Sequence, residues 1–214
     1  MFHGKLWLQK IGGNYEPDEK NREIHIKKLT SDMSDDFLNY FDHDAFSDHE
    51  EWSYCYCLES HLGKEENDQY TDIETRRNKA RALIENGIMN GYLIYEGKKV
   101  IGWCNAGDKS DYNPICKNPA FFTDEPVKGK IKILYCIDIA PDWRGKGLAR
   151  LVMERVLEDA QKEGFSYVEG YPFTDEKFSY QYRGPLKLYQ AYGFEPVRKE
   201  EWVYIMRKNL DKEV

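Results

Sequence analysis

The chain has 214 residues, of which 41% are hydrophobic and 14% aromatic, enough for one domain with a packed core. Its formal net charge of -7 argues against nucleic acid as the main partner, because phosphate contacts need a clustered excess of Lys and Arg. No apolar run reaches the ~18 residues needed to span a bilayer, and the first residues lack the apolar stretch of a signal peptide.

The cysteines and the loop-like segments indicate where the protein resides and how the chain is divided. Five cysteines, an odd number without the spacing of a disulfide framework, indicate reduced thiols and a cytoplasmic protein. Residues 11–22 are polar and loop-like. We therefore expect an N-terminal extension over residues 1–22 and a single domain over residues 23–214.

The first part of the domain is expected to form a strand, two helices and a hairpin. Residues 23–29 alternate imperfectly in hydrophobicity, which indicates the strand. Ser31 or Asp32 is suited to cap the first helix, and its apolar face would hold Phe37, Leu38, Phe41 and Ala45. A capping box over Thr71–Glu74 begins the second helix and Asn86-Gly87 ends it, with an apolar stripe of Ile73, Ala80, Leu83 and Ile84. Two short apolar runs, 91–95 and 100–105, indicate the hairpin.

The remaining elements alternate between strands and helices. Residues 130–140 are nearly continuous in apolar residues, as expected for a central strand buried on both faces. A helix is expected from Leu148 to Gly164, a strand over 167–173, a short helix ending at Gly193, and a closing strand over 201–208. This order predicts an α/β fold with a mixed, mostly antiparallel sheet flanked by helices.

The segment "APDWRGKGLARLV", residues 140–152, joins the central strand to a helix and has the chemistry of a phosphate site. Glycines let the backbone approach an anion, because no Cβ intervenes. The first N–H groups of a helix have no intrahelical acceptor, and the helix dipole adds partial positive charge there. Arg144 and Lys146 add full charges. A pyrophosphate would suit this position, although glycines also simply ease a turn.

Two motifs in this order resemble the GNAT N-acetyltransferase superfamily. Arg144-x-x-Gly147-x-Ala149 matches the acetyl-CoA loop pattern Q/R-x-x-G-x-G/A, and Leu188-Tyr189-x-x-x-Gly193-Phe194 matches L-Y-x-x-x-G-F. The resemblance covers residues 91–208 well and residues 23–90 only in the order of elements. It implies the GNAT fold, in which the fourth and fifth strands separate in a V-shaped cleft.

The resemblance also implies where acetyl-CoA binds. Backbone groups around Ile137 and Ile139 on the fourth strand would pair with the pantetheine amides as an added strand does. The N–H groups of the loop would hold the pyrophosphate, with basic side chains nearby. The implied cofactor-binding residues are Ile137, Ile139, Arg144, Gly145, Lys146, Gly147, Leu148, Ala149 and Arg150.

Catalytic roles follow from the direct transfer that the family uses. Tyr189 matches the tyrosine whose hydroxyl reaches the thioester sulfur, and a phenol can protonate a leaving thiolate. The attacking amine must lose a proton, and the candidates for its acceptor are Glu169 and Asp138. The alternative is that Asp138 is a polar residue at a strand end and Glu169 a surface or ion-paired one. The family's frequent Asn is replaced by Tyr182, which puts one usual cofactor contact in doubt.

Residues 43–61, "HDAFSDHEEWSYCYCLESH", occupy the region where GNAT enzymes usually build acceptor specificity. Its aromatic and acidic side chains are candidates to line a pocket for a cationic amine: Trp52, Tyr54, Tyr56, Asp48, Glu50 and Glu51. Cys55, Cys57 and His61 resemble metal ligands, but a structural zinc site needs four ligands at recognised spacings. We favour small buried thiols on one face of a strand and expect no metal.

The sequence therefore predicts an N-acetyltransferase that uses acetyl-CoA as co-substrate and a primary amine, expected to be a small molecule, as acceptor. A protein N-terminus or lysine is an alternative acceptor, and a non-catalytic acyl-CoA sensor is an alternative of another class. Neither nucleic acid nor membrane is expected as a partner, and a homodimer is left open.

Overall fold

The computed structural model describes residues 23–112, 127–175, 177 and 181–211, so the predicted extension over 1–22 lies outside it. The described strands form one seven-stranded sheet in the order β1-β2-β3-β4-β5-β7-β6. Neighbouring strands are antiparallel except β4 and β5. Their bounds are β1 Ile24–Lys28, β2 Gly91–Glu96, β3 Lys99–Asp108, β4 Ile131–Ile139, β5 Tyr167–Gly170, β6 Glu195–Lys199 and β7 Tyr204–Asn209.

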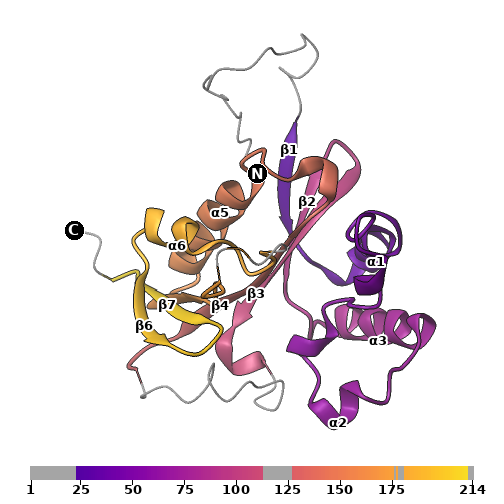
Figure 1. Ribbon diagram of the computed structural model, residues 1–214, viewed down its shortest axis with the longest axis horizontal. Coiled ribbons are helices and arrows are strands. Elements are labelled where there is room, and N and C mark those ends of the chain that lie inside the picture. The colour runs from indigo at the N-terminus through magenta and orange to yellow at the C-terminus, as the bar shows by residue number, and fades with distance from the viewer. Residues whose placement is uncertain (1–22, 113–126, 176, 178–180, 212–214) are drawn as a thin grey trace.

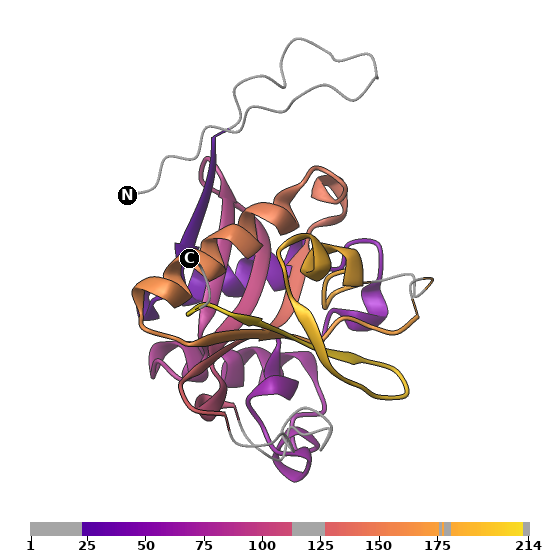
Figure 2. The ribbon, with the colours of Figure 1, turned by 90° about the vertical axis from the view of Figure 1, so that its left-hand side faces the viewer.

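Helices cover both faces of this sheet (Figure 1). The pair α1 (Ser34–His43) and α3 (Ile73–Glu85) lies on one face, and α5 (Leu148–Lys162) and α6 (Leu186–Ala191) lie on the other. In Figure 2, α5 crosses the strands obliquely on the near side of the sheet. A short helix α2 (Lys64–Asn67) and several single 3-10 turns complete the described part. The predicted mixed sheet with helices on its faces is confirmed. Among the described helices, none is both long and apolar enough to cross a membrane.

Two helix starts differ from the prediction. Neither Ser31 nor Asp32 caps α1, because residues 31–33 form a 3-10 turn that runs directly into the helix without a side-chain cap. Helix α3 is capped by Asp72, whose carboxylate accepts the backbone N–H of Thr75 at 2.8 Å. A single Asx cap therefore replaces the predicted Thr–Glu box, and Ile73 is exposed instead of belonging to the buried stripe.

The strand β6 was missed in the sequence. Its burial pattern is exposed at nearly every position, and it forms the outer edge of the sheet beside β7. An edge strand that packs against little has no alternation to detect, and Pro196 within it is typical of an edge position.

A β-bulge in β4 sets the directions of the side chains that matter most for the site. Asn105 of β3 is opposite Cys136, while the next residue, Ala106, is opposite Leu134, so that Tyr135 is the additional residue. Leu134 belongs to the core beneath α5, and Ile137, three residues further, belongs to it as well. A bulge places two consecutive residues on one side and shifts the alternation by one.

The sheet opens at the same point. β4 and β5 pair only from Ile131–Tyr167 to Leu134–Gly170, and the rest of β4 has no partner on that side within β5. The predicted separation of the fourth and fifth strands is therefore present, and it begins at the residue that precedes the bulge. The part of β4 that follows the bulge separates two large groups of core residues, one beneath α1 and α3 and one beneath α5.

Candidate functional site

The loop before α5 exposes its backbone to solvent. After a 3-10 turn at Pro141–Trp143, Gly145 and Gly147 take φ angles of +74° and +84°, and Gly147 is the N-cap residue of α5. A Cβ on either glycine would meet no atom within 4 Å. Both glycines are thus needed for the left-handed backbone and not for close packing, which leaves open space next to a helix N-terminus.

A groove of about 520 Å³ extends from this loop along β4 to α6. Eight of the nine predicted cofactor-binding residues line it: Ile137, Ile139, Arg144, Gly145, Gly147, Leu148, Ala149 and Arg150. The exception is Lys146, which is exposed, with its Nζ 5.0 Å from the centroid of the Trp143 ring. The sequence reasoning missed the opposite wall, where Lys187 adds a third basic side chain to those of Arg144 and Arg150.

Arg144 connects the loop to the segment of residues 43–61. Its Nε donates to the backbone carbonyl of Ile139 at 2.8 Å, and its terminal nitrogens pair with the carboxylate of Asp48. The guanidinium therefore lies at the edge of the groove but is also tied to residues 43–61. Nothing in a helix-start motif indicates this second partner, because it comes from 96 positions away in the chain.

One predicted backbone contact is already in use. The N–H of Ile137, expected to pair with an added strand-like ligand, donates to the carbonyl of Tyr182 at 2.6 Å. Residues 181–184 lie between β5 and α6 and reach into the gap where β5 no longer pairs with β4. A ligand that accepts a hydrogen bond from the Ile137 N–H must therefore replace the Tyr182 carbonyl.

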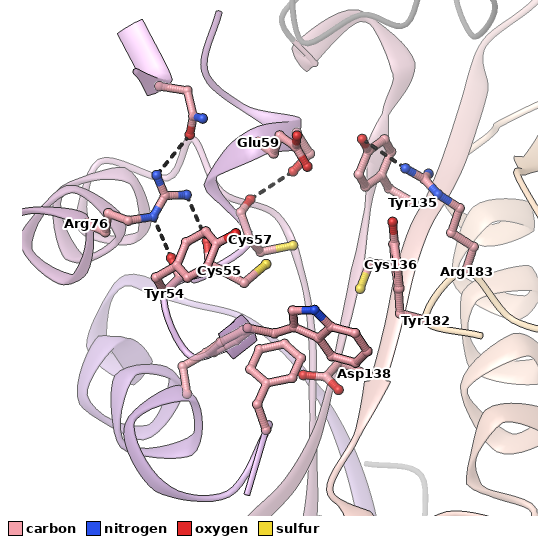
Figure 3. A pocket seen from close by; sticks show the side chains of 15 residues that line it. Tyr54, Cys55, Cys57, Glu59, Arg76, Tyr135, Cys136, Asp138, Tyr182 and Arg183 are labelled. Atoms are coloured by element: carbon pink, nitrogen blue, oxygen red, sulfur yellow. Dashed lines mark hydrogen bonds between the residues drawn. The ribbon is translucent and has the colours of Figure 1, made fainter. Parts of the chain in front are cut away.

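A second cavity, of about 410 Å³, lies on the other side of β4 (Figure 3). Its walls come from the segment after α1, from α3, from β4 and from residues 182–183. Of the six predicted pocket residues, Trp52 and Tyr54 line it. The lining residues that the sequence did not indicate include Phe41, Phe46, Arg76, Tyr135 and Arg183, which the chain order keeps far apart.

β4 is the wall between the two spaces. Beyond the bulge, Cys136 and Asp138 line the cavity, while Ile137 and Ile139 line the groove. Asp138 is only 1% exposed. Tyr182 lines both spaces. The predicted base candidate Asp138 is thus placed beside the point where the two spaces approach each other.

The Arg183 guanidinium forms a cationic part of the cavity wall. It is buried and donates to the Tyr135 hydroxyl at 3.3 Å. Its central carbon lies 4.5 to 5.7 Å from the centroids of four aromatic rings, those of Tyr135, Tyr182, Phe173 and Trp202. Such stacking holds a desolvated guanidinium in one orientation. The cavity therefore offers a fixed positive charge and a buried carboxylate.

The sequence model of the acetyltransferase (GNAT) family matches residues 26–194. The chain belongs to the GNAT acetyltransferase family. No curated protein matches it.

Several solved structures share the fold of this chain. PaiA N-acetyltransferase from Thermoplasma acidophilum, in complex with coenzyme A, is 13% identical with a TM-score of 0.52, and the match covers 87% of this chain and 99% of that one. An acetyltransferase from Thermus thermophilus is 14% identical with a TM-score of 0.50, covering 87% and 96%. The NatC complex bound to Gag peptide and CoA contains a chain that is 13% identical with a TM-score of 0.52, covering 87% and 98%. At such identities the likeness shows the fold alone.

Glu169, the other predicted base, lines neither the groove nor the cavity. It lies on β5, fully buried, where it accepts from Lys109 Nζ at 2.7 Å, Arg207 Nε at 2.7 Å and Tyr171 Oη at 3.0 Å. This carboxylate thus already accepts three hydrogen bonds, two of them from cationic side chains. This arrangement matches the ion-paired alternative for Glu169.

Tyr189, predicted from the second GNAT motif, is fully buried in α6. Its hydroxyl donates to the backbone carbonyl of Arg183 at 2.6 Å, and burial raises the pKa of the phenol above its usual value. Its ring leaves no room for a Cβ at Gly170. Tyr189 is not among the lining residues of the groove or of the cavity. Its role as the acid remains a prediction.

The Cys-x-Cys segment is not a strand, contrary to expectation. Residues 50–60 form 3-10 helices and turns, and Cys57 has a φ of +54°. Cys55 and Cys57 nevertheless both line the cavity. Among the described residues, no group of three His, Cys, Asp or Glu side chains could hold a metal ion.

Proposed function

We propose that this GNAT protein transfers an acetyl group from acetyl-CoA directly to the primary amine of a small molecule. The observation that carries the proposal is that a single strand, β4, separates a basic groove from a cavity that contains a carboxylate. The groove would hold the cofactor through the loop N–H groups and the basic side chains of Arg144, Arg150 and Lys187. A volume of about 410 Å³ is in the range of small-molecule sites.

In this proposal the residues of the chain have separate tasks. Asp138 accepts the proton of the attacking amine, which is mostly protonated in water and must be neutral to attack. Backbone N–H groups of β4 stabilise the oxyanion. A hydroxyl protonates the leaving thiolate, and the candidates are Tyr189 from the family motif and Tyr182, which lines both spaces.

Two other functions would use the same fold. A peptide N-terminus or lysine as acceptor is suggested by the NatC neighbour, whose structure contains a peptide. A sensor would bind acyl-CoA without turnover. Thiol release from acetyl-CoA, measured with polyamines, amino acids, aminoglycosides and short peptides, separates the three. We expect turnover with a small amine; turnover with peptides alone, or saturable binding without turnover, would contradict this.

Asp138→Asn tests the base. We expect kcat to fall about 10²-fold, because the neutral amide cannot accept the proton. We also expect the acidic limb of the pH profile of kcat/KM to disappear, while acetyl-CoA affinity changes little, because Asp138 faces away from the groove. Glu59→Gln is the matched variant, because Glu59 is the other carboxylate of the cavity and is exposed. If this variant loses the acidic limb instead, Asp138 is not the base.

Tyr182→Phe and Tyr189→Phe, measured side by side, separate the two candidate acids. We expect Tyr182→Phe to lower kcat at least tenfold with little change in stability. We expect Tyr189→Phe to lower the free energy of unfolding by about 1–3 kcal/mol, because it removes the donor to the buried Arg183 carbonyl. Thiols of lower pKa need less help to leave, so acyl donors with better leaving groups should restore the rate of the variant that lacks the acid. Restoration in Tyr189→Phe and not in Tyr182→Phe would assign the role to Tyr189.

A further inference from the structure

Three cysteines surround the acceptor cavity. Cys55 and Cys57 lie on the segment after α1, Cys136 lies on β4, and all three line the space between these walls. Figure 3 shows the sulfurs of Cys55 and Cys57 on one side of the cavity and that of Cys136 on the other. None of them has a place in the transfer proposed above.

The Cys57 sulfur has the environment of a thiolate. It accepts a hydrogen bond from Asn105 Nδ2 at 3.0 Å, and Asn105 is the residue opposite Cys136 in the β3–β4 pairing. The neighbouring Cys136 thiol, assisted by Asn105, lowers the pKa of Cys57 to about 7 against the opposing effect of burial. Cys57 in turn raises the pKa of Cys136, and burial raises that of Cys55. One acidic thiol therefore lies beside a neutral one.

The backbone holds Cys57 in a strained position. Tyr56 and Cys57 have φ angles of +41° and +54° and are the non-glycine residues with positive φ in the described chain. The Tyr56 side chain fixes this turn, since it is buried, donates to Asp42 at 2.7 Å and stacks on Phe41 at 5.8 Å between centroids. Strain of this kind persists where the surroundings demand it and is concentrated at functional sites.

We propose that Cys57 and Cys136 are a redox pair, in which a peroxide oxidises Cys57 and Cys136 then closes a disulfide across the acceptor cavity. The Cys57 thiolate attacks one oxygen of hydrogen peroxide, the O–O bond breaks, and Cys57 sulfenic acid and hydroxide form. The Cys136 thiol loses its proton and attacks the Cys57 sulfur. The S–O bond breaks, and the hydroxide that leaves takes up the proton as water. Two thiols and one peroxide thus yield one disulfide and two waters.

The disulfide would join the two walls of the cavity. Cys57 belongs to the segment of residues 43–61 and Cys136 is two residues from Asp138 on β4. A covalent bond between them would occupy the space beside the carboxylate and fix the position of the segment. Loss of acetyl transfer on oxidation rests on the proposed function, whereas formation of the bond does not.

Peptide mapping of the full chain tests the bond itself. Reduced protein is treated with hydrogen peroxide, remaining thiols are alkylated, and tryptic peptides are identified by mass spectrometry. Cleavage after Lys and Arg places Cys55 and Cys57 in residues 29–64, Cys136 in 133–144 and Cys104 in 100–109. We expect a cross-link between 29–64 and 133–144. In the reduced protein at pH 7, we expect Cys57 to be alkylated about tenfold faster than Cys104, which is buried away from the cavity.

Single variants assign the bond. The cross-link should disappear in Cys57→Ser and Cys136→Ser and persist in Cys55→Ser and Cys104→Ala. In Cys136→Ser, Cys57 sulfenic acid should accumulate and be trapped by dimedone, because its resolving thiol is missing. A cross-link that survives in Cys57→Ser, or a wild-type chain whose Cys57 stays reduced under peroxide, overturns the proposal.

Acetyl transfer is measured in the same samples. We expect peroxide to lower turnover at least tenfold in the wild type and dithiothreitol to restore it, with no such response in Cys57→Ser. If the cross-link forms but the reduced protein transfers no acetyl group, the redox pair is supported and the proposed function is contradicted. Transfer that continues unchanged in fully cross-linked protein contradicts the blocking of the cavity.

Discussion

Gly147→Glu is expected to weaken coenzyme A binding by roughly 10²–10⁴-fold. The substitution puts a carboxylate where the N–H groups at the start of α5 face open space, next to the position proposed for the pyrophosphate. Two or more charge-assisted hydrogen bonds of about 1.5–3 kcal/mol each would be lost, and like charges would repel. Isothermal titration with coenzyme A measures the change directly.

The control must reproduce the backbone strain, because Gly147 has a φ of +84° and any side chain there costs about 1–2 kcal/mol. Gly164→Glu does so at the opposite end of the same helix, where φ is +74° and a Cβ also meets no atom within 4 Å. Both variants should stay folded, with the Gly164 variant losing somewhat more stability because its carboxylate lies at the negative end of the helix dipole, and only Gly147→Glu should lose affinity. If it binds coenzyme A as the Gly164 variant does, the loop is not a phosphate site.

Glu169→Ala is expected to lower the free energy of unfolding by about 3–5 kcal/mol, because two buried cations would lose their shared carboxylate. The side chains of Lys109 and Arg207 are only 15% and 12% exposed, and both pair with Glu169. Glu169→Gln should fall between the wild type and the Ala variant, since it keeps the shape and part of the hydrogen bonding. Urea denaturation, followed by fluorescence and by circular dichroism, provides the measurement.

An ion pair on the surface of α5 serves as the control for the buried ion pairs of Glu169. Glu158→Ala removes the partner of Lys162 one turn away on α5, and we expect a loss of no more than about 0.5 kcal/mol. The same experiment decides between the two roles of Glu169. If the role of Glu169 is structural, folded Glu169→Gln keeps most of its kcat. If the variant instead keeps its stability and loses most of its kcat, Glu169 is the base.

The glycine loop before α5 could be predicted from the sequence because the features that define it are local. The strand, the turn and the helix start lie within residues 130–152, so the glycines and the basic residues that act together are neighbours in the chain. The C-terminal ends of α3 and α5 and the β2–β3 hairpin could be predicted for the same reason. Short-range signals of this kind depend on few tertiary contacts.

The acceptor cavity could not be predicted in the same way, because its residues meet only in the folded chain. Arg183 follows a strand and has no pattern around it, yet it is enclosed by aromatic rings from β4, from Phe173 and from Trp202. Cys55 and Cys57 were expected to lie on one face of a strand, but Tyr56 and Cys57 take left-handed conformations that no glycine at these positions signals. Tertiary packing imposes that conformation.

The bulge at Tyr135 determines which residues of β4 line the cavity and which line the groove. Because it shifts the alternation of β4, substitutions at Cys136 or Asp138 alter the surface of the cavity, while those at Ile137 or Ile139 alter the groove. Choice of acceptor can therefore vary along one set of positions while the other set stays constant. Deleting Tyr135 would remove the bulge without exchanging the two sets, because Leu134 and Cys136 already pair with consecutive residues of β3.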